Sequence, residues 1–391
     1  MLRSLFSGIS GLRAHQTMLD VTGNNIANVN TTGFKASQTQ FQDTLSQALS
    51  SGGAAQAGLG GTNPAQVGLG VRVAGITTNF QQGAAQLTNR STDMMINGDG
   101  FFTVRNGAQQ YYTRAGSFNF DSIGQLVTSD GSLVQGWAAV GGVINANGPL
   151  SDIKLPISTL MSAQATANAT FGGNIPSDAP DPTVLNRTMD VYDAVGNKRS
   201  LALTFGFSAG AWTVGATDGA STVAPTAMTF SGGGALTSPS TLTVGAVTVD
   251  LSTITGFAGL TSVEGLVQDG QQAGTLESFG LNQDGTIVGQ FSNGLKQAIG
   301  QIALATFTNP TGLEKAGSSL YRTSANSGDP RIGTAGTGSR GKLAGGALEM
   351  SNVDLSAEFT NLIIAQRGFQ ANSRVITTSD EVLQELVNLK R

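Results

Sequence analysis

The sequence contains no cysteine and a single histidine, His15, in 391 residues. Without cysteine, neither a disulfide nor a thiolate-bound metal can stabilise the chain. The lone histidine has no neighbouring carboxylate cluster that would make a catalytic triad or a metal site, so a packing or surface position is expected for it. Because no acid, base and nucleophile can be named together, we expect no enzyme activity, no cofactor and no metal.

Charged residues are also scarce, at 12% of the chain, and the net charge is -4. This balance provides no basic surface for nucleic acid or for an anionic membrane. Apolar runs of about 18 residues are absent, so no membrane insertion is expected. The first eleven residues are interrupted by Ser and Gly, and no small-residue cleavage site follows them. Any export is therefore expected to occur without a cleaved signal peptide.

Glycine, by contrast, is abundant, with 54 residues. From Val71 onward, short apolar stretches of strand type alternate with turn sequences such as Asn97–Gly100, Asn106–Gly107 and Asp130–Gly131. Strands about ten residues apart with such turns indicate all-β domains. The length allows two or three domains with cores of their own. We expect a mainly β protein.

The two ends of the chain have a helical pattern instead. The N-terminal apolar residues are three, four or seven positions apart, and those of the C-terminal segment recur every seven residues from Leu355, with Phe359 and Val387 in the companion position. Such seams are typical of amphipathic or coiled-coil helices. Isolated helices of this kind are marginal in water, so they need burial against their own chain or against other subunits. The seam residues are Leu5, Ile9, Leu12, Leu19, Leu362, Phe369, Ile376 and Leu383.

A polar stretch rich in asparagine follows the first helical pattern. Asn24, Asn25 and Asn28 can compete for backbone hydrogen bonds, and Gly33 can adopt a left-handed conformation. These features predict a helix exit. At the other end of the chain, Ser351, Asn352 or Asp354 could each cap the start of the last helix.

Several segments resemble one family in the correct order. The stretch Asn24–Lys35 is similar to the signature near the N-terminus of bacterial flagellar axial proteins, the family of rod, hook and hook-associated subunits. Gln366–Arg374 resembles the other terminus of that family. Gly300–Leu313 and Ser351–Asp354 resemble the segments before its last helix. The resemblance covers about the first 155 and the last 115 residues.

The resemblance implies a mainly β fold with terminal α-helices and two nested β domains. Composition alone would not reveal that the first β domain is discontinuous. The expected organisation is a terminal helical, coiled-coil assembly domain of residues 1–30 and 355–391, connectors at 31–70 and 346–354, a first β domain of residues 71–155 and 275–345, and an inserted outer β domain of residues 156–274.

The insertion bears on which branch of the family the chain resembles. Roughly 120 residues between Ile157 and Leu276 are surplus to a rod subunit, which favours the hook branch. The resemblance then implies a structural subunit that polymerises with itself into a curved tube in the extracellular flagellum, with the terminal seams and the helix exit serving assembly. The implied partners are the distal rod protein, the hook cap protein, the hook-filament junction proteins and the flagellar type III export apparatus. Two alternatives are a distal rod subunit and, from another class, a secreted β-rich adhesin or binding module.

Two glycine-rich or acidic motifs carry less weight. Gly336–Gly341 fits a dinucleotide fingerprint, but loop-like residues precede it, and Leu343 stands where a phosphate-binding loop needs Ser or Thr. Asp93–Gly100 invites a calcium-loop reading, but Met95 occupies a position that needs an oxygen ligand. We interpret the first as a flexible connector and the second as a β-turn.

Overall fold

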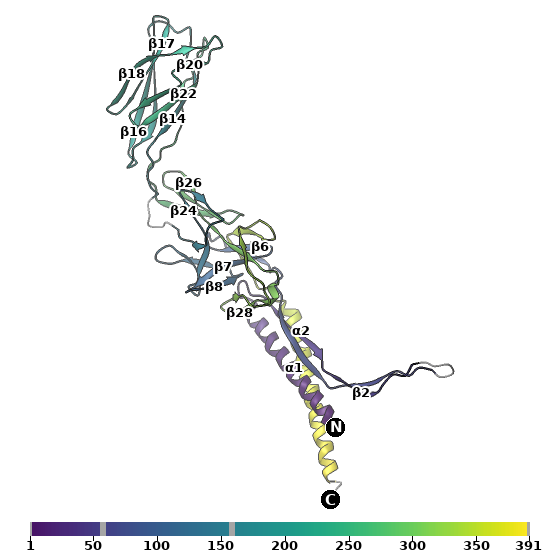
Figure 1. Cartoon of the computed structure of the whole chain (residues 1–391). Helices are drawn as coiled ribbons and strands as arrows, with labels where there is room; N and C mark the ends of the chain where they lie inside the picture. The colour runs from purple at the N-terminus through teal and green to yellow at the C-terminus, as the bar shows by residue number, and fades with distance from the viewer. Residues whose placement is uncertain (1, 55–59, 156–160, 389–391) are drawn as a thin grey trace. The chain divides into compact units, whose positions relative to one another are not determined.

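The structure, a computed structural model, describes residues 2–54, 60–155 and 161–388 (Figure 1). The outermost positions of the predicted assembly domain, residues 1 and 389–391, and the predicted start of the inserted domain at residue 156 lie outside this range. The chain divides into two units. The first comprises Met1–Leu155, Gly280–Val288 and Ala298–Arg391, and the second comprises Pro156–Phe279 and Gly289–Gln297.

The first unit begins and ends with a helix, α1 (Leu2–Ala27) and α2 (Leu355–Asn388). Its remaining elements are strands and one 3-10 turn. They are β1 (Ser37–Asp43), β2 (Ser46–Ser50), β3 (Ala65–Gly68), β4 (Val71–Thr78), β5 (Ala85–Leu87), β6 (Met94–Asn97), β7 (Phe101–Asn106), β8 (Gln109–Thr113), β9 (Phe118–Phe120), β10 (Leu126–Thr128), β11 (Leu133–Val140), β12 (Val143–Ile144), β13 (Ser151–Asp152), β27 (Leu304–Thr306), η1 (Pro310–Gly312), β28 (Glu314–Gly317), β29 (Leu320–Arg322), β30 (Arg331–Gly333), β31 (Lys342–Gly345) and β32 (Ala347–Glu349).

Strand β7 lies at the centre of this unit, where it pairs antiparallel with β8, β11 and β27. Its residues Phe101, Phe102 and Val104 are buried. Phe101 packs edge to face against Phe307, with ring centroids 5.7 Å apart. Burial of such large aromatic side chains supplies most of the favourable free energy available to a small sheet core.

The second unit is a β-sandwich built of the strands β14 (Asn168–Asn174), β15 (Thr183–Tyr192), β16 (Lys198–Ser208), β17 (Ala211–Asp218), β18 (Ser221–Ala227), β19 (Thr229–Phe230), β20 (Leu236–Ser238), β21 (Thr241–Val244), β22 (Val247–Thr255) and β23 (Glu264–Gln268). One four-stranded sheet has the order β21-β22-β14-β23, and the other has the order β15-β16-β17-β18. Alternate residues of β16, including Leu201, Leu203 and Phe205, are fully buried. This alternation is the period-two pattern expected of a strand with one face in a core.

Three strands run across the division between the units: β24 (Leu276–Leu281), β25 (Thr286–Phe291) and β26 (Lys296–Ile302). Residues 275–279 and 289–297, which the sequence analysis assigned to the first β domain, group with the second unit. Local hydrogen bonds explain this grouping, since Thr275 N donates to Ser292 Oγ at 3.0 Å and Asn293 Nδ2 donates to Gln272 O at 3.0 Å.

Residues 31–70, expected as a connector, contain regular strands. Strand β1 pairs antiparallel with β4, and β2 pairs antiparallel with β3. All residues of β2 and β3 are exposed. Because no face of these strands is covered by the described part of the chain, their sequence lacks the apolar alternation by which strands are usually found. The fold class itself, mainly β with one helix at each end, is confirmed.

Candidate assembly region

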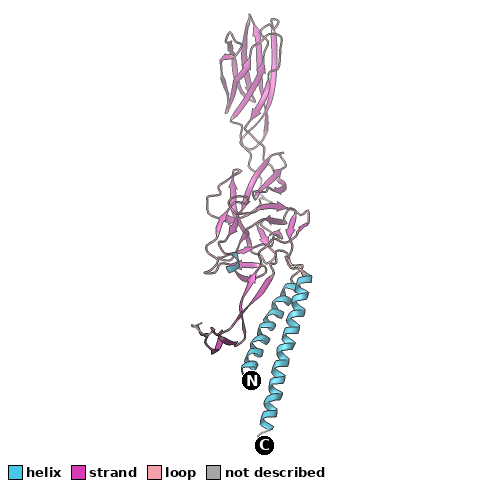
Figure 2. Cartoon of the chain, turned by 90° about the vertical axis from the view of Figure 1, so that its right-hand side faces the viewer, coloured by secondary structure: helices cyan, strands magenta, loops and turns pink. Residues whose placement is uncertain are grey.

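The two terminal helices lie side by side in opposite directions (Figure 2). A Cβ atom built on Gly11 of α1 would lie 2.7 Å from Asn372 Oδ1 of α2. A Cβ atom built on Gly368 would lie 2.5 Å from His15 Cε1. As residue numbers rise along α1 they fall along α2, so the pair is antiparallel. Glycine allows the two backbones to approach more closely than a larger residue would.

The predicted seam residues occupy the half-buried part of this pair. All eight have intermediate exposure: Leu5, Ile9, Leu12, Leu19, Leu362, Phe369, Ile376 and Leu383. The fully buried residues described on the pair are small or polar, among them Ala14, Asn25 and Ala365. The seams are therefore only partly satisfied within one chain.

Helix α2 also carries a set of apolar side chains that lie exposed. The companion residues Phe359 and Val387 belong to it, with exposures of 52% and 70%. Its other members lie off the heptad seam and its companion position, so the spacing that predicts the helix does not reveal them. Leu355, the first residue of the heptad seam, is 40% exposed as well. We call the other exposed large apolar residues of the helix the exposed stripe of α2: Phe359, Ile363, Ile364, Val375, Val382, Leu386 and Val387.

The buried amide of Asn25 joins three segments where α1 approaches its end. Its Nδ2 donates to Ser37 O at 2.7 Å and to Glu358 Oε1 at 3.0 Å, while its Oδ1 accepts from Ser37 N at 3.0 Å. Ser37 begins β1, and Glu358 lies in the first turn of α2. A fully bonded buried amide fixes the arrangement of the groups around it.

Asn24 and Asn28 make local contacts around the last turn of α1. Asn28 Nδ2 donates to Asn24 O at 2.9 Å, and Asn28 Oδ1 accepts from Thr31 Oγ1 at 3.1 Å. These bonds satisfy backbone and side-chain groups just where the helix ends at Ala27.

Gly33 is held between two distant parts of the chain. Its φ is +68°, and a Cβ atom would lie 2.4 Å from Ala115 N. Its own N–H donates to Glu349 O at 2.8 Å. No residue with a side chain fits this backbone and this contact without displacement.

A buried ionic cluster lies directly beyond Gly33. Lys35 Nζ is 2.5 Å from Glu349 Oε1, and both side chains are fully buried. Glu349 Oε1 also accepts from Gly83 N at 2.9 Å, and Glu349 Oε2 lies 3.4 Å from Arg114 Nη1. Burial lowers the pKa of Lys35 and that of Arg114, and Glu349 opposes the shift in both. Removing one partner of such a cluster leaves an uncompensated buried charge.

Asn352 and Asp354 complete the junction before α2. Asn352 Oδ1 accepts from Ala36 N at 2.8 Å, and its Nδ2 donates to Gln81 O at 3.0 Å. Asp354 is the N-cap of α2, since its Oδ1 accepts from the N–H groups of the second and third residues of the helix at 2.8 and 3.2 Å. Of the three candidate caps, the structure selects Asp354.

Lys35, Arg114 and Glu349 were not predicted as residues of the site. Lys35 stood at the end of the asparagine-rich stretch, but its ionic partner is 314 residues away. The only signal for these residues in the sequence was that charged residues are scarce in this chain. Which of the charged residues pair with one another, over such a separation in sequence, is known only from the fold.

The glycine-rich motif and the acidic motif, which resemble a nucleotide-binding and a calcium-binding loop, form strands and turns. Gly336–Lys342 leads into β31 with no helix immediately after it, so the geometry of a phosphate-binding loop is absent. Within Asp93–Gly100, Met94–Asn97 form β6, and the turn comes only after it. His15 is half-buried and packs edge to face on Phe41, with centroids 5.8 Å apart.

The described residues contain no group of three or more His, Cys, Asp or Glu side chains placed to hold a metal ion. In the same part of the chain, no helix combines the length and the apolar character required to cross a membrane.

Comparison with protein families gives three matches along the chain. Residues 5–35 match the model described as flagella basal body rod protein. Residues 95–173 match the flagellar hook protein FlgE/F/G D1 domain, and residues 344–389 match the flagellar basal body rod FlgEFG protein C-terminal model. The first and last matches together contain most of α1, all of α2, and Gly33, Lys35 and Glu349, but not Arg114.

Full-length relatives give a finer result. The flagellar hook protein FlgE of Borreliella burgdorferi is 39% identical, with 100% of both chains covered. That of Salmonella typhimurium is 35% identical, with 99% of this chain and 100% of the relative covered. The chain belongs to the flagellar hook protein family. It is a structural subunit of the flagellar hook.

One relative of this chain is named as a rod protein. The flagellar basal-body rod protein FlgG of Bacillus subtilis is 38% identical over 392 residues, with 100% of both chains covered. Among solved structures, Helicobacter pylori flagellar hook protein FlgE2 shares the fold, with a TM-score of 0.54, 14% identity, and coverage of 68% of this chain and 100% of that one.

Proposed function

We propose that this hook protein polymerises through its terminal helices into a curved tube that joins rod to filament and transmits torque while bending. The support comes from the helix pair. Its seams are half-buried within one chain, and the exposed stripe of α2 adds several large apolar side chains. Exposed apolar side chains gathered on one element mark a contact with another molecule.

A contact between the exposed stripe and a different face of the next subunit is heterologous. Heterologous contacts that do not close into a ring produce an open helical polymer. Because association also covers the half-buried seams, assembly stabilises the folded ends of each chain by mass action. The contacts around Glu349 and Asn25 then fix the direction of the helices relative to the β strands of the first unit.

The remaining assignments follow from membership of the family and are proposals for this chain. The partners are the distal rod protein, the hook cap protein, the hook-filament junction proteins and the type III export apparatus of the flagellum. The subunit is exported without a cleaved signal peptide to the extracellular hook. Its role is mechanical, and catalysis is not part of it.

The single observation that carries the proposal is the exposed stripe of α2, and charge substitution on it is the test. Ile363→Asp and Val382→Asp place a charge on the stripe, at positions 50% and 45% exposed in the single chain. Burying an unpaired charge in an interface costs several kcal/mol, so the concentration required for polymerisation should rise by at least about tenfold. Electron microscopy of curved tubes and sedimentation of the polymer measure this.

Thr360→Asp is the matched control, because Thr360 is exposed and lies in a heptad row of the same helix, with Arg367, Arg374 and Glu381, that is polar throughout. It introduces the same residue with the same helix propensity. It should polymerise like the parent chain. Tubes of normal length and yield from both stripe variants would rule out the stripe as the assembly surface.

The rod-named relative from Bacillus subtilis supports a second candidate, a subunit of the distal rod. Antibody labelling of isolated basal bodies separates the two. Label on the curved segment outside the cell supports the hook, and label confined to the straight rod supports the alternative.

A further inference from the structure

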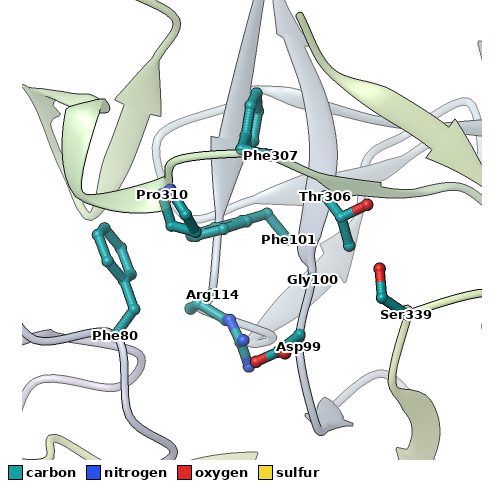
Figure 3. Close-up of a pocket in the computed structure, with 9 residues that line it drawn as sticks. All are labelled: Phe80, Asp99, Gly100, Phe101, Arg114, Thr306, Phe307, Pro310 and Ser339. Atoms are coloured by element: carbon teal, nitrogen blue, oxygen red, sulfur yellow. The ribbon is translucent and has the colours of Figure 1, made fainter. Parts of the chain in front are cut away.

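A small pocket lies beside the buried ionic cluster, within the first unit. It encloses about 130 Å³. Its walls are the aromatic rings of Phe80, Phe101 and Phe307, together with Pro310. Figure 3 shows Arg114 among these residues, with its guanidinium group facing the carboxylate of Asp99. The lining is thus apolar apart from a few polar groups, as in sites that bind small ligands.

The guanidinium group of Arg114 has few partners for a buried cation. The side chain is only 3% exposed, and among the described residues its one ion pair is the 3.4 Å contact with Glu349 Oε2. Its Nε is buried and has no hydrogen-bond partner within the described part of the chain. The guanidinium also stacks on Phe101, with Cζ 5.3 Å from the ring centroid. Arginine can donate five hydrogen bonds, so most of this capacity is unused.

Glu349 cannot neutralise both cations of the cluster. It makes the closer contact with Lys35, at 2.5 Å, and also accepts from the backbone of Gly83. Lys35, Arg114 and Glu349 together carry one excess positive charge when all are ionised. Asp99 attracts Arg114 electrostatically, but its side chain is exposed. Aromatic walls lower the local dielectric and strengthen the attraction of this charge for an anion.

We infer that this pocket binds a carboxylate group, which pairs with Arg114. A planar carboxylate accepts two parallel hydrogen bonds from a guanidinium group, and this is the strongest pairing available to arginine. The volume admits a group as small as acetate or the end of an acidic side chain. The carboxylate comes either from a small free acid or from an Asp or Glu side chain of a second copy of the chain.

Nuclear magnetic resonance of the full-length monomer tests this. The Nε–H signal of Arg114, assigned by its loss in Arg114→Lys, is followed during titration with sodium acetate at low protein concentration. Sodium chloride at the same ionic strength is the parallel titration. A saturable shift with acetate and none with chloride is expected. An equal shift with both salts would overturn the inference in favour of a general anion site.

The variant Asp99→Asn keeps Arg114 in place, and for it the inference predicts the direction in which the dissociation constant of acetate changes. Asp99 competes with the ligand for the guanidinium group, so its neutralisation should lower the dissociation constant of acetate by about two- to fivefold. Glu381→Gln is the matched control, because it removes one exposed carboxylate near the end of α2. This control should leave the constant unchanged. An equal effect of both variants would mean that net charge, and not the pocket, governs binding.

A concentration series of the protein without acetate identifies the source. If the Arg114 signal shifts as the protein is concentrated, and acetate reverses the shift, the carboxylate belongs to a second copy. A response to acetate alone identifies a small free acid. Absence of a shift in both series would show that the pocket holds water only and would overturn the inference.

Discussion

At Gly33 the backbone adopts a left-handed conformation and passes directly against Ala115. Two residues later, Lys35 enters a fully buried pair with Glu349. Asn25, on the last turns of α1, bonds to β1 and α2 at once. These three positions bring the N-terminal stretch, the segment before α2 and the β core together at one point. The residues of the stretch Asn24–Lys35 therefore serve to position the helices, because they fix where both helices leave the core.

Gly33→Ala should destabilise the first unit. The added methyl group meets the Ala115 backbone 2.4 Å away, and alanine also disfavours a φ of +68°. The two effects together should cost roughly 2–4 kcal/mol of unfolding free energy. Calorimetric unfolding of the full chain measures this loss. Gly75→Ala in β4 is the control, because a Cβ atom at Gly75 meets nothing within 4 Å. The stability of this variant should stay close to that of the parent. Equal stability of the two variants would contradict the close contact at Gly33.

At the scale of elements, the helix pair depends on small residues. Gly8, Gly11 and Gly368 face the partner helix, and each would bring a Cβ atom within 3.4 Å of it. Glycine lowers the helix propensity of α1 by up to about 1 kcal/mol per residue. Close packing of α1 on α2 offsets this cost. The same closeness leaves the large apolar residues of α2 at the edges and outer side of the pair, where they are available to other subunits.

Gly11→Leu should separate the two helices. Its Cβ would lie 2.7 Å from the amide of Asn372, and the rest of the side chain has to enter the interface. Overpacking of this kind costs typically 1–3 kcal/mol, so backbone amides of α1 should exchange hydrogen about 5- to 150-fold faster. Hydrogen-exchange mass spectrometry of the monomer gives the readout.

Gly23→Leu serves as its comparison in the same helix. Its Cβ meets no atom within 4 Å. The gain in helix propensity should therefore slow exchange or leave it unchanged. Slower exchange in Gly11→Leu as well would mean that propensity outweighs the close approach of the helices.

At the scale of the whole molecule, each unit has its own buried core. The second unit buries a cluster that includes Leu203, Phe205 and Trp212. The first unit buries a separate aromatic cluster that includes Phe101, Tyr112 and Phe307. Cores that share no residues can lose stability separately.

Leu203→Ala should therefore lower only one of two unfolding transitions. Leu203 is fully buried in the second unit, and truncation to alanine costs about 2–5 kcal/mol. Calorimetry combined with hydrogen exchange in β16 and in β7 assigns the loss. Val104→Ala, at a fully buried position of β7, should give the opposite pattern. A single transition that shifts equally in both variants would show that the units unfold together.

Much of the architecture could be predicted from the sequence, because the signals are local. Seven-residue spacing marked the C-terminal helix, and Asn-Gly and Asp-Gly turns marked the β regions. The exposed strands β2 and β3 escaped prediction, because a strand without a buried face has no alternating pattern. The exposed stripe of α2 was not predicted either. The helix carries two sets of apolar residues, and the sequence alone does not tell which set is buried against α1 and which is exposed.

The sequence by itself determined the fold class, the helical ends, the special position of Asn24–Gly33 and the family. Each depends on residues close together in the chain or on a signature that is itself contiguous. Only the tertiary structure decided that Lys35 meets Glu349, 314 residues away, that Gly33 passes against Ala115, and that Arg114 is left with unused donors beside a pocket. The physical reason is that desolvation and close approach depend on which segments are brought together. Those distances are set by the packing of the β core and the helices.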